Sequence, residues 1–426
     1  MKRTLFSLSF MILSLSYTTA QTIEECQQAA ERNYPLIQQY DMIGKTTHLT
    51  IANIAKDWLP QVSAQAQATY QNDVTAFPSE MQAFYQQMGI SMDGLKKDQY
   101  RIAIDVQQKV YDGGMSSSQK EVARQQGAVQ TAQTEVTMYQ VRRRVNELYF
   151  TLLLIDEQIR LNGDLQELLS ANERKLMSMF ERGTAAESDY HTVKAERLTA
   201  LQQLTALQSQ RRTISLLLST LCGLSVEKII KPADVPLPTM QPAEQRPELK
   251  AIEAQLRLAD AQEKSLDAAL MPRFSVFAQG FYGYPGYNLF EDMRNRSWSL
   301  NGMIGARLTW NIGALYTRKN DKAKLNVQRS TFNVQRDVFL FNNHLEQLQQ
   351  NEDIARYRQL MADDNEIITL RQSVRKAAES KLLHGIIDVN DLVKEIHAEN
   401  SAQMQQSIHE IEMLKEIYDL KFTTNN

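Results

Sequence analysis

The chain has 426 residues, of which 43% are hydrophobic and 23% are charged, and its formal net charge is −3. This length is enough to bury a large core, and the charge content is too high for a helical membrane protein. Because Arg142-Arg143-Arg144 is the only basic cluster, the charge balance argues against nucleic acid as a partner.

The first twenty residues have the pattern of a signal peptide. Lys2 and Arg3 precede an apolar run from Leu5 to about Leu15, and small residues lead to Ala20. We therefore expect residues 1–20 to be a signal peptide and the mature chain to begin at Gln21.

The rest of the chain contains an internal repeat, visible as matching segments in the same order. NYPLIQQY…DWLPQVSAQAQATY at 33–70 aligns with QRPELKAI…AALMPRFSVFAQGFY at 245–282. Further along, ERGTAAESDY at 181–190 aligns with LHGIIDVNDL at 383–392. Each match places proline, glycine and aspartate at equal intervals, which predicts two copies of one structural unit.

The copies are predicted to occupy residues 21–222 and 248–426. The linker between them, at 223–247, holds half of the chain's ten prolines, which is typical of a connection that is neither helix nor strand. In each copy we expect a helix, two strands and a pair of long helices.

Proline ends the first helix of each copy, at Pro60 and at Pro272, because it cannot continue a helix. Alternation of apolar and polar residues then predicts four strands, at about 61–75, 100–111, 273–284 and 297–310. Strands of this length with one apolar face are typical of an outer-membrane barrel.

Long hairpin helices are predicted at about 115–222 and 314–420. Gly113, Gly114 and Gly313 lie where strand becomes helix, where glycine permits a sharp change of direction. At about 1.5 Å per residue, a helix from Met115 to Arg182, just before Gly183, spans roughly 100 Å. Apolar residues spaced alternately by four and three predict coiled-coil seams, and they are Val141, Val145, Leu148, Leu152, Ile155 and Ile159 in the first copy and Val334, Val338, Phe341, Leu345 and Leu348 in the second.

Four strands are too few to close a barrel, since the smallest barrels have about eight. Open strand edges are not tolerated in lipid, so several chains must contribute strands to one barrel. The sequence therefore predicts a mainly α protein with a β-barrel part, assembled as a hollow symmetric oligomer.

At these residues the chain resembles the TolC family of outer-membrane efflux and secretion channels. The resemblance covers essentially all of the mature chain and is carried by the helix ends WLP and LMP, the strand exits VYDGG and TWNIG, the two G-x5-D hairpins and LLSTLCGLS. It implies a homotrimer with a twelve-stranded barrel continuous with a long periplasmic coiled-coil tunnel.

The same resemblance implies a location in the outer membrane of a diderm bacterium, in contact with outer-membrane lipid. The function it implies is that of the exit duct of a tripartite efflux or type I secretion system. The partners would be a periplasmic adaptor (membrane fusion) protein and an inner-membrane RND or ABC transporter.

Family resemblance also directs attention to the hairpin tips. It implies that Gly183 and Thr184, with Gly385 and Ile386, form the turns and contact the adaptor. Asp391 matches the first of two aspartates that narrow the pore in the family, whereas Lys394 takes the place of the second.

Asp391 and its counterpart Asp189 have two interpretations. Carboxylates ringing a pore favour cations, whereas a carboxylate in the first turn of a helix interacts favourably with the helix dipole. We expect the pore-lining role more for Asp391 than for Asp189, which the helix-start role explains on its own.

We expect no metal site, no cofactor and no enzymatic activity. The six histidines are scattered, and no catalytic motif is present. Met81, Met88 and Met92, in the loop 74–99, are interpreted as part of an apolar loop cluster with Phe77, Phe84 and Tyr85 in preference to a copper site.

Cys26 and Cys222 either form one bridge or remain two buried free thiols, and we favour the thiols. Two other functions compete with the channel. An exported adhesive coiled-coil protein leaves the four strands unexplained, and a periplasmic adaptor would carry small soluble β-domains.

Overall fold

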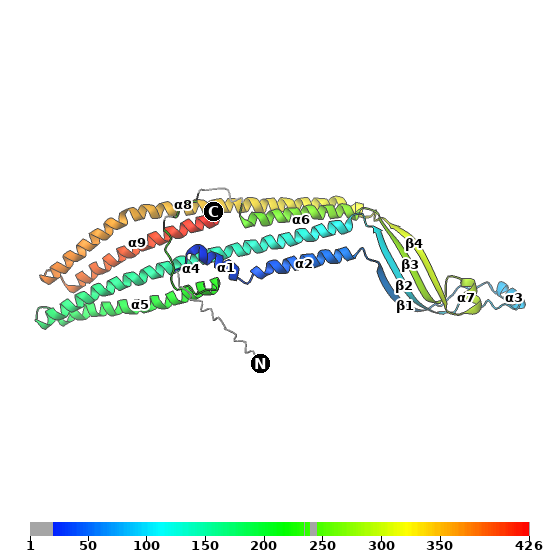
Figure 1. Cartoon of the computed structure of the whole chain (residues 1–426), viewed down its shortest axis with the longest axis horizontal. Helices are drawn as coiled ribbons and strands as arrows, with labels where there is room; N and C mark the ends of the chain where they lie inside the picture. The colour runs from blue at the N-terminus through cyan, green and yellow to red at the C-terminus, as the bar shows by residue number, and fades with distance from the viewer. Residues whose placement is uncertain (1–19, 234, 239–244, 426) are drawn as a thin grey trace, which may run out of the picture. The chain divides into compact units, whose positions relative to one another are not determined.

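The structure, a computed structural model, describes residues 20–233, 235–238 and 245–425. Residues 1–19 of the predicted signal peptide and Pro242 of the linker lie outside the described residues. Figure 1 labels the helices and strands, which in chain order are α1 (Ile23–Asn33), α2 (Ile37–Lys56), β1 (Gln61–Tyr70), α3 (Ser79–Gln87), β2 (Asp98–Tyr111), α4 (Met115–Glu181), α5 (Glu187–Cys222), α6 (Pro247–Ala269), β3 (Arg273–Tyr284), α7 (Leu289–Asn295), β4 (Ser299–Thr309), α8 (Ala314–Leu383) and α9 (Val389–Thr424).

These elements form two compact units, and both predicted repeats contribute to each unit. One unit contains the sheet with α2 and α6, and the other contains α1, α5, α9 and the hairpin turns. The long helices α4 and α8 supply residues to both units.

The sheet is antiparallel with the strand order β1-β2-β3-β4. Its central pair joins β2 of the first repeat to β3 of the second, for example through Val106 opposite Ala278. Consequently β1 and β4 are the sheet edges, and each has one side without a strand partner among the residues that the structure describes.

β1 is shorter than the predicted strand at about 61–75. It ends at Tyr70 because the chain turns there, with the N–H of Gln71 donating to the carbonyl of Lys97 at 2.9 Å and the N–H of Val74 to the Asp73 carboxylate at 2.9 Å. β4 runs from Ser299 to Thr309, so it is also slightly shorter than the predicted strand at about 297–310.

Two short helices, α3 in the predicted loop 74–99 and α7 between β3 and β4, interrupt the connections between strands, and Figure 1 shows both at the same end of the strands. This region has a small core of Leu95, Tyr284 and Met293 of α7, against which Phe77 and Met92 pack. Met81 and Met88 are exposed on the surface of this region, so the predicted cluster is only partly buried.

The first repeat has two helices before its strands, because the helix is interrupted at Tyr34-Pro35, between α1 and α2. α2 ends at Lys56 and α6 at Ala269, a few residues before Pro60 and Pro272. The second hairpin continues to Thr424, four residues beyond the predicted end at 420, because the last turn of α9 is buried.

The helical unit has its main core around the seam predicted on α4. Val145, Tyr149 and Leu152 are fully buried there with residues of α1, α5 and α9. Aromatic packing extends this core, since Phe150 lies 5.5 Å from Tyr418 of α9, ring centre to ring centre. The four-three spacing on α4 therefore marks a buried contact within one chain.

Cys26 on α1 and Cys222 on α5 belong to this same core and are both free. The Cys222 thiol donates to the carbonyl of Cys26, with 3.4 Å between sulfur and oxygen. A hydrogen bond between the two thiols and burial raise the pKa of Cys26, which keeps it protonated and unreactive.

The linker ends are attached to the helical unit. Gln21 forms a parallel bridge with Ile229, so the segment predicted as a linker is partly paired. At its other end Arg246 is buried beside the stacked rings of Tyr139 and Phe422 and donates to the carbonyl of Phe422 at 2.7 Å. These contacts hold the C-terminal end of α9 in place.

Candidate functional site

Each long hairpin turns at a glycine with left-handed backbone. Gly183 has φ +77° and Gly385 has φ +69°. In both turns the next N–H, of Thr184 or Ile386, donates to a carbonyl five residues earlier, at 2.8 Å and 2.9 Å. This is the Schellman geometry that ends a helix, and glycine adopts it without the cost imposed by a Cβ atom.

The helices after the turns begin differently. The Asp189 carboxylate accepts the N–H of Ala186 at 3.3 Å, which fits the helix-start interpretation. In the second hairpin the start is capped by Asp388, which accepts the N–H of Asp391 at 2.9 Å. The Asp391 carboxylate is exposed and has no hydrogen bond or ion pair with any described residue.

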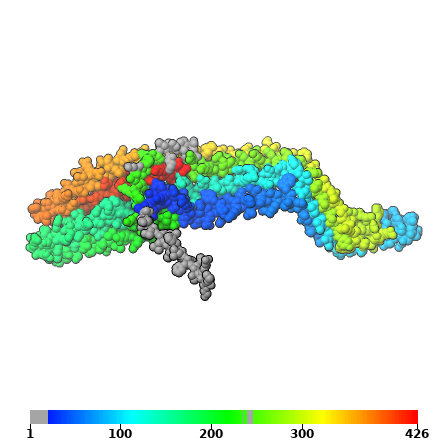
Figure 2. All heavy atoms as spheres, in the orientation of Figure 1, coloured from blue at the N-terminus to red at the C-terminus, as the bar shows by residue number. Residues whose placement is uncertain are grey.

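The two hairpins pack against each other near their turns through a shared apolar core. Figure 2 shows the ends of the green α4–α5 hairpin and the orange α8–α9 hairpin side by side. Leu169 and Val193 of the first and Leu392 and Ile396 of the second are fully buried in this core. His397 of α9 also contacts Glu196 of α5 at 3.0 Å.

An ion pair occurs at equivalent positions of the two hairpins with its charges exchanged. Arg197 on α5 contacts Glu173 on α4 at 2.5 Å, and Arg375 on α8 contacts Glu399 on α9 at 2.5 Å. The difference in residue number between the turn glycines, 183 and 385, is the same as that between 173 and 375 and that between 197 and 399. The two ion pairs therefore occupy equivalent positions relative to the turns. Sequence alignment alone misses this correspondence, because the paired residues differ in charge between the copies.

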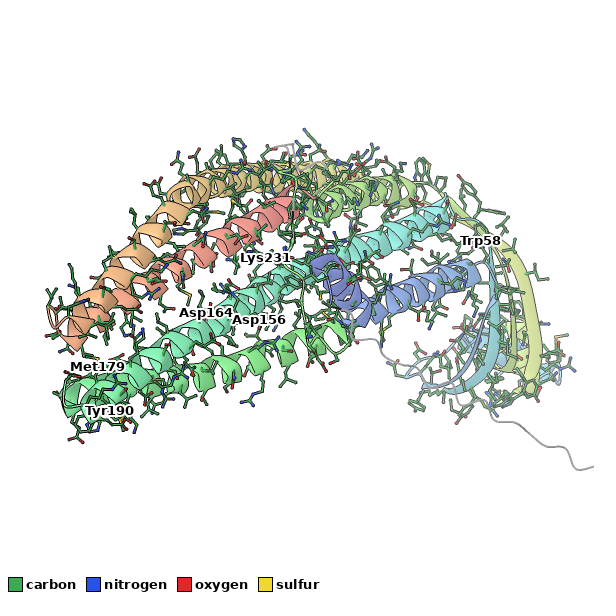
Figure 3. All side chains as sticks on the ribbon, turned by 60° about the vertical axis from the view of Figure 1, so that its left-hand side comes forward. Trp58, Asp156, Asp164, Met179, Tyr190 and Lys231 are labelled. Carbon is green, nitrogen blue, oxygen red and sulfur yellow. The ribbon has the colours of Figure 1, made fainter. Side chains whose placement is uncertain are left out.

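The surface of the tips is partly apolar. Met179 and Tyr190, labelled in Figure 3, lie at the end of the first hairpin and pack on the tip core. Beyond them, Ile386 is 69% exposed and Leu383 is 54% exposed. Lys394 is exposed on the same first turns of α9 as Asp391.

The first strand-to-helix transition depends on Asp112. Its carboxylate accepts the N–H of Gly114 at 2.9 Å and the N–H of Ser116 at 2.8 Å, which caps α4. Burial opposes ionisation, but the hydrogen bonds from Ser116 and Gly114 outweigh it and lower the pKa of Asp112. The sequence signal is an aspartate just before a helix start.

Gly113 and Gly114 both have positive φ, +69° and +83°. A Cβ atom at Gly113 would also overlap Met271, next to Pro272, whereas space is open around Gly114. Gly313 lies between β4 and α8 as predicted, but it lacks positive φ and has room for a Cβ atom, so this transition does not require a glycine. There the neighbouring Trp310 ring donates to the carbonyl of Leu270 at 3.0 Å.

The sheet has one apolar and one polar face. Leu300, Ile304 and Leu308 lie on the apolar face and are 69–87% exposed. On the polar face Gln65 and Gln279 both donate to the carboxylate of Asp105. A face this apolar is costly in water and favourable against lipid.

The seam predicted on α8 is exposed along its length, unlike the seam on α4. Its residues are between 43% and 64% exposed, and they are Val334, Val338, Phe341, Leu345 and Leu348. An exposed coiled-coil seam requires a partner helix, and none of the helices in the described part of the chain covers this one.

No group of His, Cys, Asp and Glu side chains in the described part of the chain is arranged to hold a metal ion. Among the helices of the described residues, none is both long enough and apolar enough to cross a membrane.

No protein-family profile matches the chain, and no curated protein matches its sequence. Solved structures do share its fold. The Campylobacter jejuni CmeC outer membrane channel has a TM-score of 0.67 at 11% identity, over 94% of this chain and 85% of that chain. The outer membrane protein VceC from Vibrio cholerae has a TM-score of 0.65 at 12% identity, over 94% of both chains.

A third structure, of CusC, concerns folding and transmembrane channel formation and has a TM-score of 0.68 at 12% identity, over 94% of this chain and 91% of that chain. At these identities the similarity is one of fold. The resemblance to the TolC family predicted from the sequence is confirmed at that level.

Proposed function

We propose that the chain is one subunit of a homotrimeric outer-membrane channel. The observation that carries the proposal is a four-stranded sheet with an exposed apolar face and two unpaired edges, β1 and β4. Lipid would cover the apolar face, and β1 of one copy would pair with β4 of the next. Three copies then close a twelve-stranded barrel without open edges.

The exposed seam on α8 supports the same assembly. Its apolar side chains, centred on Phe341, would pack against a helix of a neighbouring copy and complete a ring of coiled coils. The long helices α4 and α8 and their hairpin partners would form the wall of a periplasmic tunnel. We propose that the protein acts as a passive duct, without catalytic chemistry.

The hairpin tips are proposed as the site where the duct meets a periplasmic adaptor, which in turn binds an inner-membrane RND or ABC transporter. The exposed Leu383 and Ile386, with the turns at Gly183, Thr184 and Gly385, offer an apolar contact surface there. The system would be a tripartite efflux pump or a type I secretion system.

The proposed constriction lies at the same tips, and Asp391 is its charged group. The Asp391 carboxylate has no hydrogen bond or ion pair with a described residue, so it is available to a passing ion. The exposed Lys394 nearby would partly offset its charge. Asp391→Ala should shift the reversal potential of the channel towards anion selectivity. Asp189→Ala should leave selectivity unchanged and destabilise the start of α5, where Asp189 bonds Ala186.

The reversal potential across a planar bilayer, measured under a salt gradient, checks this assignment. Assembly of each variant is confirmed by its mass in mild detergent. An assembled Asp391→Ala channel with unchanged selectivity would remove Asp391 from the constriction.

The function itself is tested by reconstituting the purified protein in the same bilayer. Discrete conductance steps from a trimer, together with fractionation to the outer membrane, are expected. A trimer that fractionates with the outer membrane but does not conduct would favour the adhesive coiled-coil alternative. A soluble periplasmic protein would favour the adaptor.

A further inference from the structure

The polar face of the sheet carries an excess of positive charge. Because the register pairs odd-numbered residues with odd-numbered residues, as in Asp105 opposite Gln279 and Arg273 opposite Thr309, these residues share one face. The basic side chains on this face are Arg101, Lys109, Arg273 and Arg307. Asp105 is the one carboxylate that the register places among them.

The carboxylate does little to neutralise the arginines. Asp105 is instead bonded to the amides of Gln65, at 3.0 Å, and Gln279. Of the ion pairs found between described residues, none involves Arg101, Arg273 or Arg307. Lys109 is 3.6 Å from Asp57, and both are solvent-exposed enough for this pair to be weak.

Aromatic rings on the same face hold two of the guanidinium groups. Arg101 lies 4.0 Å from the ring centre of Phe281 and donates to the side-chain carbonyl of Gln279 at 2.7 Å. Arg307 lies 5.0 Å from the ring centre of Phe277. A cation–π contact orients a guanidinium group but leaves its net charge in place.

The Nε of Arg101 is buried without a hydrogen-bond partner among the described residues, so no acceptor there offsets the charge of the group. A planar, charged guanidinium group held in one orientation is suited to an anionic group such as a carboxylate or sulfonate. The neighbouring Phe281 is only 3% exposed, so it orients this guanidinium group and does not itself offer a surface to a ligand.

We propose that this face attracts anions and that small organic anions are the class of cargo that the barrel favours. The inference rests on the proposed function, in which the polar face lines the lumen. With three copies, each basic residue would form a ring, and low-dielectric walls strengthen the field of such rings.

The strand arginines and Asp391 are separable by experiment because their charges have opposite signs. Removing arginines should move the reversal potential towards cation selectivity, whereas removing Asp391 should move it towards anion selectivity. The residues also lie in different units of the chain.

The test compares the chloride-to-potassium permeability ratio of channels in a planar bilayer, followed by the ratio for benzoate as an organic anion. Arg101→Gln with Arg307→Gln should lower both ratios several-fold. Arg101→Lys with Arg307→Lys keeps the charge and should keep the chloride ratio. The matched control, Lys45→Gln with Lys324→Gln, removes two exposed lysines from α2 and α8 and should leave both ratios unchanged.

The outcomes separate this inference from the proposed function. Absence of conductance in the unmodified trimer would overturn the channel itself. Normal conductance with unchanged ratios in the glutamine variant, or an equal shift in the lysine control, would overturn only the anion preference. If the double variant fails to assemble, the exposed Arg273→Gln provides the same test, and an unchanged ratio there has the same meaning.

Discussion

At the scale of single residues, Gly113 and Gly114 are adjacent and both have positive φ, yet they constrain the chain for different reasons. Adding a Cβ atom at Gly114 costs only the free energy of holding a non-glycine residue in the left-handed conformation, about 1–2 kcal/mol. One at Gly113 also overlaps Met271, which adds roughly 1–3 kcal/mol. Gly113→Ala should therefore lower the thermal unfolding midpoint in detergent clearly more than Gly114→Ala. Equal losses would show that the contact with Met271 relaxes freely.

Glu416 on α9 makes stability depend on pH. Burial, helped by the negative charge of Asp419, raises the pKa of Glu416 to about 7, although Lys415 opposes the change. Between the unfolded value of 4.5 and about pH 7, the folded chain holds a proton that the unfolded chain has lost. The stabilisation is therefore complete below pH 4.5 and disappears as pH rises through 7.

Glu416→Gln should accordingly raise the free energy of unfolding at pH 8, by on the order of 1 kcal/mol after allowance for solvent screening. At pH 4 the variant and the unmodified protein should be alike. Denaturant unfolding at the two pH values measures the difference, and Glu366→Gln, an exposed carboxyl on α8, is the control. A gain of the same size at both pH values would contradict the raised pKa.

At the scale of elements, the two helices of each hairpin are joined by an ion pair at equivalent positions, with the charges exchanged between the hairpins. Because the second hairpin has the reverse order of charges, the first should tolerate the exchange Glu173→Arg with Arg197→Glu. Either substitution alone leaves two like charges facing each other and should cost about 1–3 kcal/mol. Unfolding of the three variants in urea provides the comparison. A double variant no more stable than the worse single one would contradict pairwise coupling.

At the scale of the whole molecule, one chain leaves both edges of its sheet and the α8 seam uncovered. Phe341 is 64% exposed, so Phe341→Glu should preserve the helix content of the chain and prevent assembly. Asn342→Glu adds the same charge one residue further along, beside the seam, and should assemble normally. Circular dichroism and mass in mild detergent measure the two properties. Normal trimer yield from Phe341→Glu would exclude the seam as a subunit contact.

The sequence by itself determined the kinds of element and their order. Period two in residues such as Ile102 and Ile104 specifies strands, and four-three spacing in Val145 and Leu152 specifies helices, because each period places apolar side chains on one face. Gly183 and Gly385 mark the turns for an equally local reason, the need for positive φ. The similarity to solved outer-membrane channels confirms the mainly helical fold, whereas the trimer and the closed twelve-stranded barrel stay predictions.

Only the tertiary structure decided which faces meet. The same four-three pattern is buried on α4 and exposed on α8, because burial depends on neighbours far away in sequence. The capping role of Asp388 depends on where α9 begins, which periodicity locates only to within a few residues. The pairing of β2 with β3 across the repeats, which gathers Arg101 with Arg307 on one face, is likewise set by long-range register and is not encoded in the alternation of either strand.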